Sequence, residues 1–246
     1  MKKGIIFDNV SFVYKNSFAH QLNNITLYIP QGSFCGITGV NGSGKTTLTL
    51  LINGLIPHKI TGILKGNVYL DGINTKEKPV SYFAKSTGMV FQNPDFMLFN
   101  LTVKEEIEFG LKNLKLNNHN KRIKEALKII GMSGFENCNP QTLSFGQKQK
   151  ICLASIIAQD PKYVVLDEPT AMLDYQSTAN LYKLLKFLNQ QGKTIIIVEH
   201  DTDFLRQYAN QIIILDQGKI VEKGSPQKVF FKINKLKKIG IKVPSF

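Results

Sequence analysis

Cysteine and arginine are scarce in this sequence of 246 residues. The three cysteines, Cys35, Cys138 and Cys152, are widely spaced and outside any C-x-x-C motif, so the sequence predicts neither a disulfide framework nor a zinc site. No apolar run approaches the roughly 20 residues that a membrane-spanning helix needs. Asp8 interrupts the N-terminus before an apolar stretch forms, and we therefore also expect no secretion signal. These absences favour a location in the reducing cytosol.

The basic excess of the chain is almost entirely lysine. Lys and Arg total 31 against 18 acids, a formal charge of +13, but only Arg122 and Arg206 are arginines. Proteins that read nucleic acids favour arginine, whose planar fork pairs with phosphate and with guanine edges. The composition therefore gives little support to a nucleic-acid partner, and we expect none.

A lysine-rich tail, residues 231–246, ends the chain. From Glu222 onward the sequence adds seven lysines and no further acid. Such a run is typical of a solvated or partly disordered end. The other interpretation is a contact with anionic lipid headgroups, in which each nearby lysine contributes about 1 kcal/mol.

Short apolar runs alternate with helical patterns along most of the chain. Strands separated by helices imply βα units and a parallel sheet buried on both faces. We therefore predict an α/β fold with a β-rich start and a helical subdomain inserted at about 93–160. The predicted strands lie near 4–14, 25–29, 32–39, 67–72, 86–93, 161–169, 193–200 and 211–224, and the predicted helices near 45–55, 103–114, 121–131, 147–159, 177–191 and 203–209.

Residues 39–46, with the sequence GVNGSGKT, match the phosphate-binding pattern G-x-x-x-x-G-K-[ST]. We call this segment the P-loop. The match follows a predicted strand and opens a predicted helix, as the pattern requires; a glycine-rich turn that fits by chance is the alternative. Backbone N–H groups of such a loop turn toward phosphate oxygens. The pattern predicts that Lys45 reaches the β- and γ-phosphates and that Thr46 ligates Mg²⁺. The expected nucleotide-binding residues of the loop are Gly39, Asn41, Gly42, Ser43, Gly44, Lys45, Thr46 and Thr47.

Residues 164–168, VVLDE, form an apolar run that ends in two carboxylates. An acid at the carboxyl end of a buried parallel strand lies beside the phosphate site of such a sheet. Asp167 is expected to hold Mg²⁺, directly or through water, and Glu168 to polarise the attacking water, which is worth roughly 10²–10⁴ in rate. Taken alone, the pair is equally well explained as a solvated strand end.

Residues 143–147, LSFGQ, open a predicted helix and closely resemble the LSGGQ signature of ABC-type ATPases. Other features of that family stand around it in the same order. Tyr14 resembles the aromatic that stacks on adenine, and Gln92 the glutamine at the junction with the helical subdomain. Asp174, in AMLD, resembles the aspartate of the D-loop, and His200 the switch histidine. Each alone is an ordinary packed or surface residue, but together they indicate the family.

The resemblance covers nearly the whole chain and implies a P-loop NTPase fold of ABC type. This fold has a parallel-sheet core, an N-terminal antiparallel β subdomain and the inserted helical subdomain, with the ATPase domain spanning residues 1–230. In this family two ATPase domains face each other head to tail, and ATP binding closes the dimer. The implied cofactors are ATP and Mg²⁺. The implied residues are Glu168, His200 and Gln92 for catalysis, Thr46, Gln92 and Asp167 for Mg²⁺, and Ser144, Phe145, Gly146 and Gln147 for the partner's ATP.

Two longer stretches, residues 53–72 and 92–113, are similar to the ATPases of energy-coupling factor (ECF) importers, which serve vitamins and transition-metal ions. This resemblance implies a peripheral protein at the cytoplasmic face of the cell membrane. Its implied partners are a transmembrane scaffold protein and a substrate-binding membrane protein. The segment after the glutamine would receive coupling helices of the scaffold, although an ordinary solvated helix fits the same pattern. The scaffold-contact candidates are Asp95, Glu105 and Glu106.

Phe145 departs from the family signature, which has glycine at this position. Glycine lets the loop approach the opposite nucleotide and takes backbone angles that Phe adopts only at a cost. We therefore expect the second ATPase of the dimer to be a paralogue with an intact signature rather than an identical chain. The alternative function is a soluble ABC ATPase without a membrane partner, linked to assembly or to nucleic acid.

Overall fold

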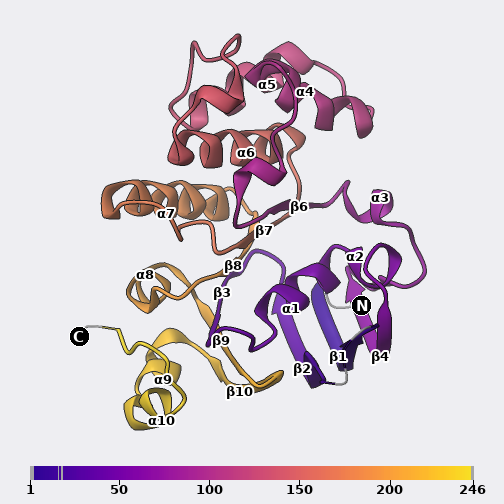
Figure 1. The fold of residues 1–246 in the computed structure, drawn as a ribbon, viewed down its shortest axis with the longest axis vertical. Helices are drawn as coiled ribbons and strands as arrows, with labels where there is room; N and C mark the ends of the chain where they lie inside the picture. The colour runs from indigo at the N-terminus through magenta and orange to yellow at the C-terminus, as the bar shows by residue number, and fades with distance from the viewer. Residues whose placement is uncertain (1–2, 16, 18, 245–246) are drawn as a thin grey trace.

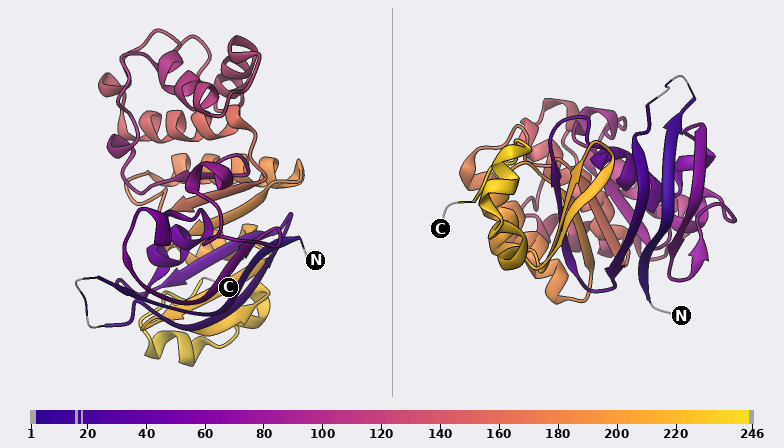
Figure 2. Two further views of the ribbon diagram at one scale, coloured as in Figure 1. Left: turned by 90° about the vertical axis from the view of Figure 1, so that its right-hand side faces the viewer. Right: turned by 90° about the horizontal axis from the view of Figure 1, so that it is seen from below.

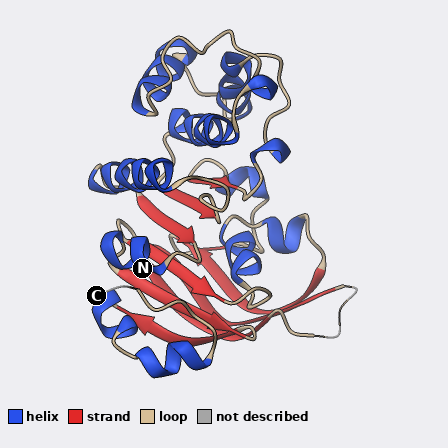
Figure 3. Ribbon diagram, turned by 60° about the vertical axis from the view of Figure 1, so that its left-hand side comes forward, coloured by secondary structure: helices blue, strands red, loops and turns tan. Residues whose placement is uncertain are grey.

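The computed structural model describes residues 3–15, 17 and 19–244, which form two sheets and a group of helices at one end (Figure 1). Residues 1, 2, 16 and 18 of the predicted ATPase domain, and residues 245 and 246 of the predicted tail, lie outside this part. In Figure 3 the strands occupy the lower part of the molecule, and the helical group lies above them.

The N-terminal sheet is antiparallel, with the strand order β2-β1-β4-β5. Alternate residues of its first strand, such as Ile5 and Phe7, are fully buried, because successive side chains of a strand point to opposite faces. They belong to the same buried core as Leu48 and Leu51 of the helix that follows the P-loop. The bounds are β1 Gly4–Tyr14, β2 Leu22–Pro30, β4 Gly62–Leu70 and β5 Ile73–Asn74.

The second sheet has the order β10-β9-β3-β8-β7-β6 and is parallel except for the β9–β10 hairpin at its edge. Every residue of β3, β6, β7 and β8 is buried, because helices cover both faces of a parallel sheet. Ile195 and Ile197 of β8 face one core, and Ile196 and Val198 face the other. The bounds are β3 Phe34–Gly39, β6 Thr87–Val90, β7 Tyr163–Asp167, β8 Thr194–Val198, β9 Gln211–Asp216 and β10 Lys219–Gly224.

Helices cover this sheet and connect its strands. α1 Lys45–Ile52 follows β3, α7 Tyr175–Gln190 follows β7, and α8 Thr202–Tyr208 follows β8. Two short helices, α2 Leu55–His58 and α3 Val80–Phe83, lie on the connection from α1 to β6.

The helical group lies between β6 and β7 in the chain and projects away from both sheets (Figures 1 and 2). Val103, Ile107 and Leu111 form the buried face of its first helix at a spacing of four residues, as an amphipathic helix requires. Thr102 and Ser144 each begin a helix with a capping box. The bounds are η1 Pro94–Phe96, α4 Val103–Asn113, α5 His119–Ile129, η2 Pro140–Thr142 and α6 Phe145–Gln159.

The lysine-rich tail is folded onto the protein, so its interpretation as a partly disordered end is wrong for residues 231–244. Its five lysines in this range are nevertheless exposed, as expected of a solvated segment. The tail contains α10 Ile233–Lys238, which follows α9 Pro226–Phe230, and both helices lie at the end opposite the helical group (Figure 2). Leu236 and Ile241 are buried in the core that contains α7. Lys232 and Lys235 pair with Glu222 at 2.8 and 2.5 Å. Lys242 Nζ lies 2.7 Å from Asp203 Oδ2, so acids from outside the tail balance several of these lysines.

These sheets confirm the predicted fold class, an α/β protein with an antiparallel β subdomain and a parallel-sheet core. Across the described ranges, no helix has the length and apolar character that a membrane span requires.

Candidate nucleotide site

A polar cleft of about 420 Å³ opens where β3 leads into α1. The P-loop and the start of α1 supply residues 41–47 of its lining, and four residues from other parts of the chain complete it. Gln21 is among these, although no sequence pattern singled it out. The lining residues are Tyr14, Gln21, Asn41, Gly42, Ser43, Gly44, Lys45, Thr46, Thr47, Gln92 and Glu168.

Glycine is required at two places in the P-loop. Gly44 has φ of +101°, and a Cβ there would lie 2.4 Å from Gln21 O. A Cβ on Gly39 would lie 2.3 Å from Leu215 O. Because α1 begins with no side-chain cap and no acid in its own first turn, neither a cap nor a first-turn carboxylate occupies its N–H groups, which suit a phosphate.

Lys45 lies buried at the base of the cleft. Its Nζ donates to Gly39 O at 3.0 Å and to Val40 O at 3.2 Å, and lies 3.7 Å from Glu168 Oε1. The hydroxyl of Ser43 is also buried, with no hydrogen-bond partner in the described structure. A buried ammonium beside an unpaired hydroxyl fits an anionic ligand.

Asp167 is suited to a cation. Its carboxylate is buried, and Oδ1 has no partner among the described residues. Burial raises the pKa of Asp167 above its usual value, while a hydrogen bond with the Thr46 side chain acts in the opposite direction. A magnesium ion would satisfy the free oxygen, so these residues fit the metal that the sequence predicts.

Glu168 is held between three side chains. Its Oε1 lies 3.0 Å from His200 Nε2, and its Oε2 accepts a hydrogen bond from Gln92 Nε2 at 3.1 Å. The residue has a left-handed backbone, with φ of +49°, and its N–H donates to Val198 O. The fold therefore brings Lys45, Gln92, Glu168 and His200 together from four separate segments.

Tyr14 lies at the wall of the same cleft. Its hydroxyl is 2.9 Å from Thr47 Oγ1, and its ring meets Phe12 edge to face at 4.9 Å. The structure thus places the predicted adenine-stacking residue beside the loop that it would serve.

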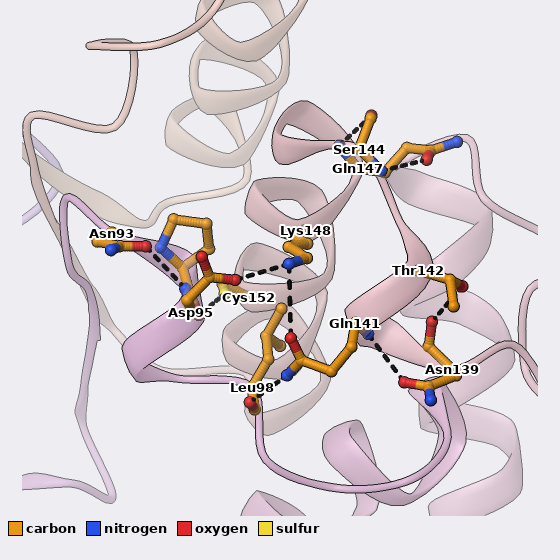
Figure 4. Close-up of polar contacts among 11 residues, drawn as sticks. Asn93, Asp95, Leu98, Asn139, Gln141, Thr142, Ser144, Gln147, Lys148 and Cys152 are labelled. Atoms are coloured by element: carbon orange, nitrogen blue, oxygen red, sulfur yellow. Dashed lines mark hydrogen bonds and ion pairs between the residues drawn. The ribbon is translucent and has the colours of Figure 1, made fainter.

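The signature residues do not line this cleft. Ser144 is the N-cap of α6 and accepts from Gln147 N at 3.3 Å, while Gln147 Oε1 accepts from Ser144 N (Figure 4). Phe145 is the first residue of α6 and has no positive φ, so the expected backbone cost of Phe is wrong. The bulk of its side chain is therefore the difference from glycine that would affect a facing nucleotide.

Asp174 is the N-cap of α7. Its Oδ1 accepts from Ser177 N at 2.7 Å, and hydrogen bonds from the backbone and side chain of Ser177 lower the pKa of its carboxyl. In this structure Asp174 therefore fixes the loop that precedes α7.

Asp95 connects η1 to α6, as Figure 4 shows. Lys148 Nζ lies 2.7 Å from Asp95 Oδ1 and 3.5 Å from Gln141 Oε1. Gln141 Nε2 in turn donates to Leu98 O at 2.9 Å. This network ties the segment after Gln92 to the signature helix; Lys148 was not among the predicted site residues.

The other two scaffold-contact candidates have local partners. Glu106 is 5% exposed, and its Oε2 accepts hydrogen bonds from Phe99 N and Asn100 N, both at 2.9 Å. We therefore correct its assignment, because a buried carboxylate that shapes the preceding loop is not free to meet a partner. Glu105 is exposed but completes the capping box with Thr102. The T-x-x-E pattern of the capping box is visible in the sequence, whereas the bonds of Glu106 depend on how the preceding loop folds.

The fold and the cleft define a P-loop protein that binds a nucleoside triphosphate. Residues 22–171 match the family described as ABC transporter. The chain belongs to the ABC transporter ATP-binding family, as the sequence predicted, and is an ATP-binding and ATP-hydrolysing subunit.

Three relatives place it within the family. The energy-coupling factor transporter ATP-binding protein EcfA of Methanocaldococcus jannaschii is 41% identical over 226 residues, 91% of this chain and 80% of EcfA. CbiO1 from Clostridium perfringens, described as part of the ABC transporter complex cbiONQ, is 30% identical with a TM-score of 0.84, over 99% of this chain and 96% of CbiO1. The ATP-binding cassette MJ0796, solved as a dimer with ADP and Pi, is 31% identical with a TM-score of 0.80, over 90% and 98% of the two chains.

Proposed function

We propose that the chain energises an ECF-type importer for vitamins or transition-metal ions, acting as one half of a head-to-tail ATPase dimer on a transmembrane scaffold. The names of two relatives support this proposal, since EcfA is an energy-coupling factor ATPase and CbiO1 belongs to a transporter complex. The place of action would be the cytoplasmic face of the membrane. We keep the proposed division into an ATPase domain at 1–230, with its helical subdomain at 93–160, and a tail.

A group of exposed apolar side chains is the observation that supports a membrane partner. Phe96 and Leu101 are 83% and 78% exposed, and Phe99 and Phe109 are also exposed. They lie on or beside the segment that begins at Gln92, which is bonded to Glu168. Exposed apolar side chains of this number in one segment are typical of an interaction site, and this one connects directly to the nucleotide cleft.

The cleft supports a direct hydrolysis mechanism. Lys45 and the N–H groups at the start of α1 would bind the β- and γ-phosphates and stabilise the charge that builds up on them. Glu168 would orient and polarise the attacking water. His200 and Gln92 hold its two oxygens, so that the carboxylate has one orientation before ATP arrives.

Thr46, Asp167 and Gln92 would hold Mg²⁺, which would offset phosphate charge. Because Gln92 Nε2 donates to Glu168, its side-chain oxygen is the atom that would serve the metal. The free Oδ1 of Asp167 is the second acceptor.

The second ATPase would be a paralogue with glycine at the position of Phe145. Ser144 and the N–H groups at the start of α6 would meet the nucleotide of that partner. Because Phe145 opens a helix rather than a strained loop, the asymmetry would come from the bulk of its side chain.

Purification in mild detergent tests this function. We expect the tagged chain to co-purify with a polytopic scaffold, a substrate-binding membrane protein and a second ATPase. The double variant Phe96→Ser/Leu101→Ser should lose the membrane proteins but retain ATP binding, whereas Ile63→Ser, an exposed apolar residue on β4, should keep them. Isolation of a soluble ATPase with no membrane protein would favour the alternative function instead.

A further inference from the structure

Glu199 is a buried carboxylate that the proposed mechanism does not use. It lies between β8 and His200, and its side chain is 3% exposed. Its backbone N–H donates to Ile37 O at 3.0 Å, so its place is set by the strand that leads into the P-loop. Glu199 is not among the residues that line the cleft. A buried carboxylate is costly unless hydrogen bonds satisfy it.

The two oxygens of Glu199 bind two different loops. Oε1 accepts hydrogen bonds from Thr170 Oγ1 at 2.7 Å and from Thr170 N at 3.2 Å. Oε2 accepts from His200 N at 3.3 Å. Thr170 stands two residues after Glu168, on the loop between β7 and α7. One side chain therefore ties the loop that carries Glu168 to the loop that carries His200.

The same two loops meet again at their functional side chains, where Glu168 Oε1 lies 3.0 Å from His200 Nε2. Glu168 has a left-handed backbone, a conformation that persists only where surrounding structure holds it. A misplacement of about 1 Å in a catalytic group can cost roughly 10²-fold in rate. The bonds of Glu199 are therefore placed where small backbone shifts matter most.

We propose that Glu199 is a positioning residue for ATP hydrolysis, which sets the separation of Glu168 and His200 by holding Thr170 and the His200 backbone. This inference rests on the proposed role of Glu168. Glu199 itself meets neither nucleotide nor water in the reaction.

The variant Glu199→Gln tests the proposal in the complex as it is isolated. Glutamine keeps the shape and one oxygen for Thr170, but sets an NH₂ group against the N–H of His200. Losing a buried charged hydrogen bond should lower kcat by about tenfold while KM for ATP changes less than about twofold. Glu222→Gln, a matched change outside the cleft, should leave kcat unaltered. Thermal unfolding establishes that each variant is folded.

Thr170 supplies a second test that does not depend on the folding of Glu199→Gln. Thr170→Val removes the hydroxyl donor and should lower kcat, whereas Thr170→Ser keeps it and should retain wild-type kcat. Adding Thr170→Val to Glu199→Gln should cost less than the product of the two separate losses, because both act on one bond network. Equal losses in Thr170→Ser and Thr170→Val would overturn the proposal.

Glu168→Gln in the same assay distinguishes a failure of the positioning proposal from a failure of the proposed function on which it rests. If Glu168→Gln stops turnover while Glu199→Gln and Thr170→Val leave kcat unchanged, the positioning role is wrong and the proposed function stands. If Glu168→Gln itself retains wild-type turnover, the proposed catalytic role of Glu168 is wrong. The positioning role of Glu199 is then wrong as well, because it depends on that role.

Discussion

Gln92 Nε2 donates a hydrogen bond to Glu168 Oε2 at 3.1 Å. Gln92 stands just after β6 and leads into η1, whereas Glu168 follows β7. Asp95 of η1 forms an ion pair with Lys148 of α6. The first turn of α6 contains residues of the signature. The nucleotide cleft is thus in polar contact with the segment that leads to the helical group.

Removal of the Lys45 charge should weaken ATP binding. Lys45→Ala removes the ammonium that is buried beside Ser43, so we expect the Kd for ATP to rise at least about tenfold, as the loss of a charge-assisted contact implies. Isothermal titration calorimetry measures this. Lys219→Ala, an exposed lysine on β10, is the control and should bind like the wild type. An unchanged Kd in Lys45→Ala would remove the lysine from the binding site.

The bulk of Phe145 should slow only one of the two ATP sites. We expect Phe145→Gly to raise turnover at the partner's P-loop, and to destabilise α6 by less than about 1 kcal/mol, because the helix propensities of Gly and Phe differ by less than those of Gly and Ala. Turnover at each site is measured by placing Glu168→Gln here or the equivalent change in the partner. Equal losses of ATPase activity from these two changes, or a functional homodimer as the only species isolated, would contradict the asymmetry.

Hydrolysis should depend on the protonation of Glu199. Burial is the main cause that raises the pKa of Glu199 from 4.5 to about 7; the charge of Glu168 adds to it, and hydrogen bonds from Thr170 and His200 oppose it. Protonation removes the negative charge that strengthens the hydrogen bonds from Thr170 and His200 N, so kcat should fall as the pH falls through about 7. The hydroxyl of Tyr182 is a further titratable group that interacts with this carboxyl.

Glu199→Gln isolates this component from the titration of every other group. The profile of kcat against pH for this variant, between about pH 6 and pH 8, should be flatter than that of the wild type, and the two rates should converge at low pH.

The effect of Glu199 ionisation on stability has the opposite sign. Because the folded pKa is raised, the folded state binds the proton more tightly, so this carboxyl makes the free energy of unfolding fall as the pH rises between about 4.5 and 7. Identical activity profiles would refute the prediction.

The tail should detach when its buried anchor is removed. Leu236 is fully buried on α10, and a buried Leu→Ala change typically costs about 2–5 kcal/mol. Leu236→Ala should therefore make the lysines of residues 232–242 accessible to trypsin, at a rate that limited proteolysis measures. Asn234→Ala, a change of an exposed residue on the same helix that removes no trypsin site, should digest like the wild type. Equal digestion of both variants would mean that the tail is not anchored at Leu236.

Local patterns predicted the fold and the cleft well, because they express local physics. The buried parallel strands read as continuous apolar runs, and the P-loop glycines are needed for positive φ and close backbone approach. Such requirements are visible in the order of residues. The same holds for Asp167 and Glu168, which stand at the end of an apolar run.

Features that depend on contacts between separate segments of the chain could not be predicted from the sequence. Glu106 has the pattern of a solvated acid but turns inward to bind the loop before α4. The tail lysines look unpaired until the fold brings Glu222 to them. Glu199 is an unremarkable strand-end residue until Thr170 meets it.

The steady-state ATPase rate of the isolated complex with Glu168→Gln, measured beside its affinity for ATP, tests the central claim most directly. If Glu168 activates the water, the variant should bind ATP within about twofold of the wild type while its turnover falls by roughly 10²-fold or more. Turnover within about twofold of the wild type, with ATP binding intact, would contradict the mechanism.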